Sequence, residues 1–322
     1  MTVRRFRSRL TLSMVAATFL AAFSGPTAAA QKTSPKRRGA VVSKNLVAGD
    51  GFPIAITYYE STAGQESPAV ILLHMKGSNR LVWKGPKGLA AQLQARGYAV
   101  VAVDLRKHGE SRVRGAAAPG RKRKKAADLR PVDYKAMVAY DLVAVKKFLL
   151  REHQAKKLNI RKTAIIATEM SAPIAAIFAR RDWLKKPYPD GPTPATSTPR
   201  GQDIRALVLL SPVEAMPGLN AGTSYRALAS PLFRVAVLVG YGKNDALDRG
   251  GKTAKRVFEK FASVAGNKKR MYLKAYPTKS RGTDMLGRRT NLERNIRNFL
   301  NLHLKKLPDQ WRDRRSKLTT DD

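Results

Sequence analysis

The chain has 322 residues, with 62 lysines and arginines against 23 aspartates and glutamates, and a formal net charge of +39. It contains no cysteine, which excludes disulfide bonds, thiolate metal sites and a lipid-modified cysteine. The length suits one sizeable α/β domain with a well-buried core. The excess of positive charge predicts attraction to anionic surfaces, whether envelope polymers, lipid headgroups or nucleic acid.

Residues 1–30 have the pattern of a secretory signal peptide. Four arginines precede a mostly apolar run from Leu10 to Phe23, and small residues follow up to Ala30, where we expect cleavage. The alternative is a membrane anchor, but a spanning helix needs about 20 apolar residues. We therefore expect an exported protein that is periplasmic, envelope-associated or secreted, with a basic linker over 31–40.

Apolar runs and turn residues predict strands and helices that alternate along the rest of the chain. Expected strands are Val41 to Ala48 and Phe52 to Tyr59 (a hairpin), Ala69 to His74, Tyr98 to Val103, 163–168, Ile204 to Leu210, Arg234 to Val239 and Met271 to Tyr276. Expected helices are Trp83 to Arg96, Pro131 to His153, one from the turn after 168, Gly251 to Val264, and a last one ending near Pro308. This alternation predicts a three-layer α/β/α sandwich, with a mostly parallel sheet, over 41–308.

Three segments stand outside this alternation. Residues 107–131 form a basic insertion that includes Arg121 to Lys125, residues 186–203 form a Pro-rich loop, and residues 309–322 form a charged tail. The run from Arg121 to Lys125 is either a solvated loop or an anion-binding element. It has no interleaved aromatic residues for stacking single-stranded nucleic acid, and the chain has no recognised nucleic-acid-binding motif. Loose attachment to an anionic envelope polymer or membrane surface is the expected consequence of the charge.

A short strand followed at once by a helix surrounds Glu169. The five residues from Ala167 to Ser171 occupy the places of a G-x-S-x-G nucleophile elbow, with small residues at both outer positions. The central residue is Glu169 and not serine. On its own the match is weak, because such a pentapeptide is common.

Further segments strengthen the match, and together they resemble the α/β-hydrolase superfamily, which includes esterases, lipases and dienelactone hydrolases. The most specific one, from Gly97 to Ser111, is similar to the family's G-Y-x-V-x-x-x-D-x-R-G-H-G-x-S and departs from it at Lys107. The resemblance implies that the nucleophile, acid and histidine positions are Glu169, Asp245 and Arg281, in the chain order that this fold uses. It also implies an oxyanion loop whose residues would be His74, Met75, Lys76, Gly77 and Met170.

These residue types close the ordinary acyl-enzyme route. Glu169 has no hydroxyl to activate, and the guanidinium of Arg281 stays protonated, with a pKa above about 12. If the two positions are adjacent, we expect Glu169 and Arg281 to form a charge-assisted ion pair. The favoured hypothesis is a catalytically degenerate protein with a binding or structural role, with a small-molecule ligand in the former active-site pocket as one candidate partner. The alternatives are a hydrolase of carboxylic esters or related small substrates that uses Glu169 or a relocated base, and a polycationic envelope protein.

Other candidate residues favour structural readings. Ser171 lies in the first helical turn after the elbow, and Ser211 is expected to cap a strand end. His74 and His108 are either loop-bracing residues or a displaced base. We expect His153 and His303 to be surface helix residues. Asp245 and Asp284, together with Glu169, are candidate hard oxygen ligands for calcium or magnesium. No segment has the spacing of a known metal motif, so the sequence predicts no metal and no cofactor.

Overall fold

The computed structural model describes residues 39–85, 88–113, 129–264 and 267–318. The predicted signal peptide, most of the basic linker and the charge run from Arg121 to Lys125 lie outside these residues. In the described ranges, no helix is both long enough and apolar enough to cross a membrane.

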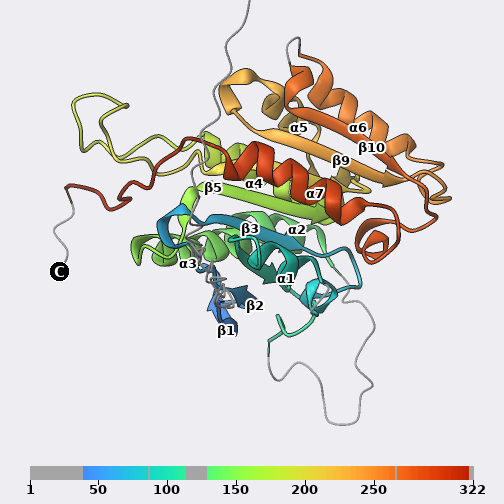
Figure 1. The fold of residues 1–322 in the computed structure, drawn as a ribbon, viewed down its shortest axis with the longest axis horizontal. Coiled ribbons are helices and arrows are strands. Elements are labelled where there is room, and N and C mark those ends of the chain that lie inside the picture. The colour runs from blue at the N-terminus through green and yellow to red at the C-terminus, as the bar shows by residue number, and fades with distance from the viewer. Residues whose placement is uncertain (1–38, 86–87, 114–128, 265–266, 319–322) are drawn as a thin grey trace, which may run out of the picture. The chain divides into compact units, whose positions relative to one another are not determined.

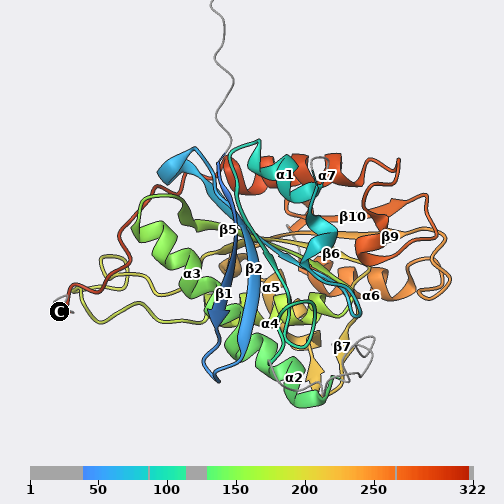
Figure 2. The same ribbon diagram turned by 90° about the horizontal axis from the view of Figure 1, so that it is seen from below.

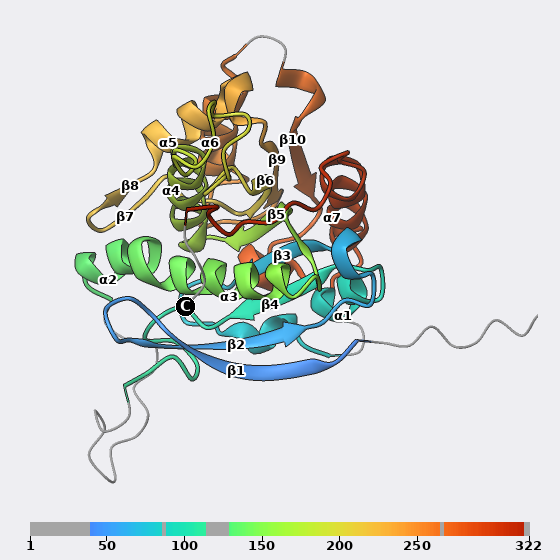
Figure 3. The same ribbon diagram turned by 90° about the vertical axis from the view of Figure 1, so that its left-hand side faces the viewer.

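An eight-stranded sheet with the order β1-β2-β4-β3-β5-β6-β9-β10 forms the centre of the domain (Figure 1). Its strands are β1 (Val41–Val47), β2 (Pro53–Tyr59), β3 (Pro68–Leu73), β4 (Ala99–Val103), β5 (Asn159–Thr168), β6 (Ile204–Leu210), β9 (Ala236–Gly242) and β10 (Met271–Tyr276). In this sheet β1 pairs with β2, and β2 with β4, in antiparallel fashion, and the other five pairings are parallel. Figure 3 shows β1 at one edge of the sheet and β10 at the other.

Helices cover both faces of the sheet, as Figure 2 shows. One face packs against α1 (Leu89–Gln94) and α7 (Leu292–Leu300). The opposite face packs against α2 (Pro131–Ala136), α3 (Leu142–Gln154), α4 (Ser171–Trp183), α5 (Gly222–Ala229) and α6 (Lys252–Ala262). The central strands are buried on both sides, which explains their continuous apolar runs. The predicted α/β/α sandwich is confirmed.

Two predicted helices are interrupted. The expected helix from Trp83 to Arg96 is a 3-10 turn (Arg80–Trp83) followed by α1, because Gly85 has a φ of 108° and Gly88 is the extended N-cap of α1. The helix after Pro131 passes through a π-helical turn, Met137–Asp141, between α2 and α3. Sequence patterning also missed a short hairpin formed by β7 (Ala215–Met216) and β8 (Leu219–Asn220).

The segment after α7 is docked on the domain. Following a π-helical turn (Asn301–Lys305), it runs beside the Pro-rich loop (Figure 1). There Arg312 donates hydrogen bonds to the carbonyls of Thr196 and Ser197 at 3.1 Å. Trp311 donates its indole N–H to the carbonyl of His153 at 3.0 Å. The expectation that His153 lies on the surface is therefore wrong, since this segment covers it and its side chain is fully buried.

Candidate active site

The turn between β5 and α4 has the backbone strain of a nucleophile elbow. Glu169 has a φ of 48°, in the left-handed region that costs a residue other than glycine about 1–2 kcal/mol. Its backbone N–H donates to the carbonyl of Leu210 at 2.9 Å. Ser171 is fully buried, and its Oγ accepts from the N–H of Thr168 at 2.7 Å. Ser171 therefore closes the turn, as the structural reading of this residue predicts.

The three residues predicted for the triad positions lie close together. Arg281 Nε lies 3.5 Å from Glu169 Oε1 and 3.7 Å from Asp245 Oδ2. The side chains of Arg281 and Glu169 are 20% and 24% exposed, whereas that of Asp245 is 3% exposed. The expected ion pair between Glu169 and Arg281 is present. Its geometry is loose, because Arg281 Nε donates no hydrogen bond to any group in the described part of the chain.

Ser211 holds the loop that carries Arg281. This loop follows β10, and the N–H of Gly282 donates to Ser211 Oγ at 3.0 Å. Ser211 has a φ of 46°, and its own N–H bonds the carbonyl of Gly240 at 2.7 Å. A side chain at position 282 would place its Cβ 2.8 Å from Met75 Sδ, so glycine allows the Met75 loop to approach. Sequence reasoning gave Ser211 only a strand-capping role and missed this link.

His74 braces the predicted oxyanion loop. It is fully buried, its Nδ1 is 2.8 Å from the carbonyl of Met75, and its Nε2 accepts from the N–H of Leu105 at 3.1 Å. Burial, followed by the proximity of His108, lowers the pKa of His74 to about 3. His74 is therefore neutral at pH 7 and engaged at both nitrogens, so it cannot serve as a displaced base. The exposed Lys76 and Gly77 follow it, with Gly77 at a φ of 77°.

His108 lies in the turn after β4. Its ring centre is 4.8 Å from that of His74, its Nδ1 is 3.0 Å from the carbonyl of Arg106, and burial lowers its pKa. Lys107, which replaces the family's glycine, has a φ of 64° and is held by an ion pair between its Nζ and Asp133 Oδ2 at 2.6 Å. A φ in the left-handed region favours glycine, so Lys107 adopts a conformation that is unusual for a residue with a side chain.

The remaining predicted site residues are placed as follows. Met170 is buried at the N-cap of α4, and Asp284 is exposed in the 3-10 turn Gly282–Met285. In the part of the chain that the structure describes, no three histidine, aspartate or glutamate side chains are grouped so that they could hold a metal ion. His303 is half-buried, and its Nε2 lies 2.8 Å from the hydroxyl of Tyr272.

Solved structures with the same architecture include hydrolases. A dienelactone hydrolase from Anabaena variabilis aligns with a TM-score of 0.55 at 14% identity, over 83% of this chain and 100% of that protein. An esterase from Pyrococcus furiosus aligns with a TM-score of 0.55 at 15% identity, over 82% of this chain and 91% of that protein. No protein-family model matches the sequence, and no curated protein does. The chain has the α/β-hydrolase fold.

The side chains at the elbow limit its chemistry. Acyl transfer needs a nucleophile with a removable proton and a base that can take the proton and return it. Glu169 offers a carboxylate that is already paired, and Arg281 offers a cation that does not release its proton. The arrangement can bind or hold charged groups, and neither Glu169 nor Arg281 is a residue type that serves as the nucleophile or the base of the serine–histidine route.

Proposed function

We propose that this chain is an exported, catalytically degenerate α/β-hydrolase-fold protein with a binding or structural role. The observation that carries the proposal is the position of the Arg281 guanidinium between Glu169 and Asp245, at the three places where a hydrolase would hold its nucleophile, base and acid. The signal-peptide pattern that the sequence predicts over residues 1–30 supports the proposed export. A small-molecule ligand beside the elbow and an anionic envelope surface remain the proposed partners.

The ion pair explains both replacements together. A buried carboxylate in the position of Asp245 is costly unless a cation faces it, and in an active triad the histidine becomes that cation only transiently. Arg281 supplies a permanent positive charge there, and Glu169 supplies a second carboxylate on its exposed side. The three residues therefore form a charged link between the loops after β5, β9 and β10.

The first test is turnover of p-nitrophenyl acetate and butyrate by the purified protein. The expected rate is that of buffer, and it is unchanged in Glu169→Gln and Asp245→Asn. If the wild-type protein hydrolyses either ester and both substitutions abolish the activity, the site is an unorthodox hydrolase and the proposal is wrong.

The second test restores the missing groups. The strained turn and the buried acid are still in place, so the double variant Glu169→Ser with Arg281→His should acquire measurable ester hydrolysis. The matched control, Glu169→Ala with Arg281→His, has the same base but no nucleophile and should stay inactive. Equal rates in the two double variants would contradict the view that the elbow has kept its former geometry.

A further inference from the structure

Three arginines lie at the N-terminal ends of neighbouring parallel strands, on the side of the sheet away from the elbow. Arg161 is near the start of β5, Arg205 is near the start of β6, and Arg234 comes just before β9. These strands are parallel neighbours, and adjacent strands are about 4.8 Å apart, so the three side chains enter one small region. Along β5 this region is roughly 26 Å from Glu169, at about 3.3 Å per residue.

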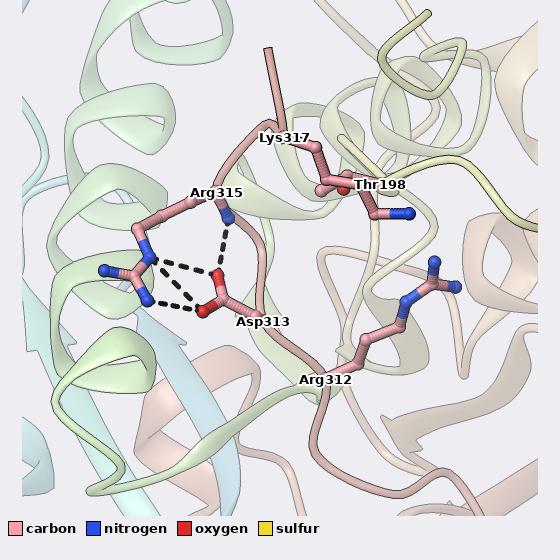
Figure 4. Close-up of a pocket in the computed structure, with 5 residues that line it drawn as sticks. All are labelled: Thr198, Arg312, Asp313, Arg315 and Lys317. Carbon is pink, nitrogen blue, oxygen red and sulfur yellow. Dashed lines mark hydrogen bonds and ion pairs between the residues drawn. The ribbon is translucent and has the colours of Figure 1, made fainter. Parts of the chain in front are cut away.

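A cavity of about 350 Å³ occupies this region. The Pro-rich loop and the docked segment after α7 complete its wall and add two more arginines. Its charged lining residues are Arg161, Arg205, Arg234, Arg312, Arg314, Asp203 and Asp309. A second hollow of about 310 Å³ shares Arg312 and also contains Lys317. In Figure 4, Arg315 turns toward Asp313 in that hollow, whereas the Arg312 side chain extends away from this pair.

Both carboxylates that line the cavity are ion-paired. Asp309 pairs with both Arg161 and Arg205 at 3.0 Å. Asp203 accepts two hydrogen bonds from Arg314, at 2.7 and 3.0 Å, and also faces Lys146 Nζ at 2.7 Å. Lys146 also pairs with Asp182, so three carboxylates face six cations in and around the cavity.

Particular donor groups of the cavity lack a carboxylate partner or a hydrogen-bond acceptor. Arg205 is 12% exposed, and its Nε is buried without a hydrogen-bond partner among the described residues. Burial lowers the pKa of Arg205, the paired Asp309 opposes this shift, and the nearby Arg234 and Arg161 guanidiniums add to it. Arg234 is exposed and has no carboxylate within 4.0 Å in the described ranges, and Arg312 is bonded to backbone carbonyls.

We propose that this cavity is a binding site for a small, multiply charged, phosphate-bearing anion, with Arg205, Arg234 and Arg312 as its ligands. Guanidinium groups present paired N–H donors that match phosphate oxygens in two-point hydrogen bonds. A volume near the lower end of ligand pockets suits one or two phosphoryl groups more than a large apolar ligand. This site is separate from the elbow and does not depend on whether the elbow is catalytic.

The test is titration calorimetry of the full chain with inorganic pyrophosphate at 0.15 M salt. Wild-type protein should bind one equivalent saturably. Arg234→Gln should bind about tenfold more weakly, since a hydrogen-bonded charge is lost at an exposed residue that carries no ion pair of its own. Arg205→Lys keeps the charge but removes the planar fork, and it should also weaken binding. The matched control is Arg289→Gln, an exposed arginine after β10 that does not line the cavity.

The source of the phosphate is separated by a second arm with vesicles that contain phosphatidic acid. If Arg234→Gln weakens pyrophosphate binding but not vesicle binding, the ligand is a free phosphate compound, and if it weakens both, a lipid headgroup also fits the cavity. Absence of saturable binding in the wild-type protein, or equal losses in Arg234→Gln and Arg289→Gln, would overturn the proposal, because general surface charge would then account for the interaction.

Discussion

The strained backbone at Glu169 predicts that Glu169→Gly is more stable than Glu169→Ala, the reverse of the usual order of these two residues. Glu169→Ala and Glu169→Gly both remove the carboxylate and its contact with Arg281, so they differ only in the backbone. A φ of 48° costs alanine about 1–2 kcal/mol and costs glycine almost nothing. Glycine gives back about 0.4–1 kcal/mol through the greater freedom of its unfolded chain. Glu169→Gly should therefore be the more stable variant, by about 0.5–1 kcal/mol.

Urea denaturation, followed by circular dichroism at pH 7, measures this difference. The matched control is Ala167→Gly, two positions earlier in β5, where the strand is buried and regular. There glycine should cost about 0.5–1 kcal/mol or more. Alanine at position 169 proving as stable as glycine, or more stable, would refute the reasoning and would mean that the turn relaxes out of the left-handed region when Glu169 is removed.

Two further changes test the docked segment and the buried histidines. Arg314→Ala leaves Asp203 buried with only Lys146 to face it, so the free energy of unfolding in urea should fall by about 3 kcal/mol. The control Arg315→Ala, at an exposed neighbour, should cost less than about 1 kcal/mol. Similar losses in the two variants would contradict a special role for Arg314. The folded-state pKa of His74 is about 3, below its unfolded value of about 6.5, so its contribution to stability is complete above pH 6.5 and is lost as the pH falls. Between pH 6.5 and 5 this loss should reach about 2 kcal/mol, and His74→Asn should show a shallower pH dependence by about one proton; an identical slope would show that His74 does not titrate on unfolding.

The sheet could be predicted from the sequence because its signals are local. Ile204 to Leu210 and Met271 to Tyr276 are observed with the predicted bounds, since each is a mostly apolar run that begins directly after a charged residue. The bounds of β9 were less accurate: the strand begins at Ala236 rather than Arg234, and it continues to Gly242 because glycine does not end a strand that is buried on both sides. The placement of Glu169 beside Arg281 came from chain order and not from any local pattern.

Contacts between segments that are far apart in the sequence are the main feature that the sequence did not predict. The burial of His153 depends on a segment more than 150 residues later in the chain, and the link from Ser211 to Gly282 joins two loops 71 residues apart. The periodicity of apolar residues along the chain carries no information about such contacts. One available signal was overlooked. Arginines near the starts of three neighbouring parallel strands must lie together at the end of the sheet where these strands begin.

The docking of Arg314 also has a consequence for the order of folding during synthesis. Asp182 and Asp203 both rely on Lys146, which is made before them, whereas Arg314 is added 111 residues after Asp203. Until then, two carboxylates at the starting edge of the sheet share a single ammonium group. In a ribosome-bound chain that lacks Arg314, these carboxylates should therefore stay in contact with water. Water should be excluded from the interior beneath α3 and α4 only after the docked segment has been synthesised and has bound.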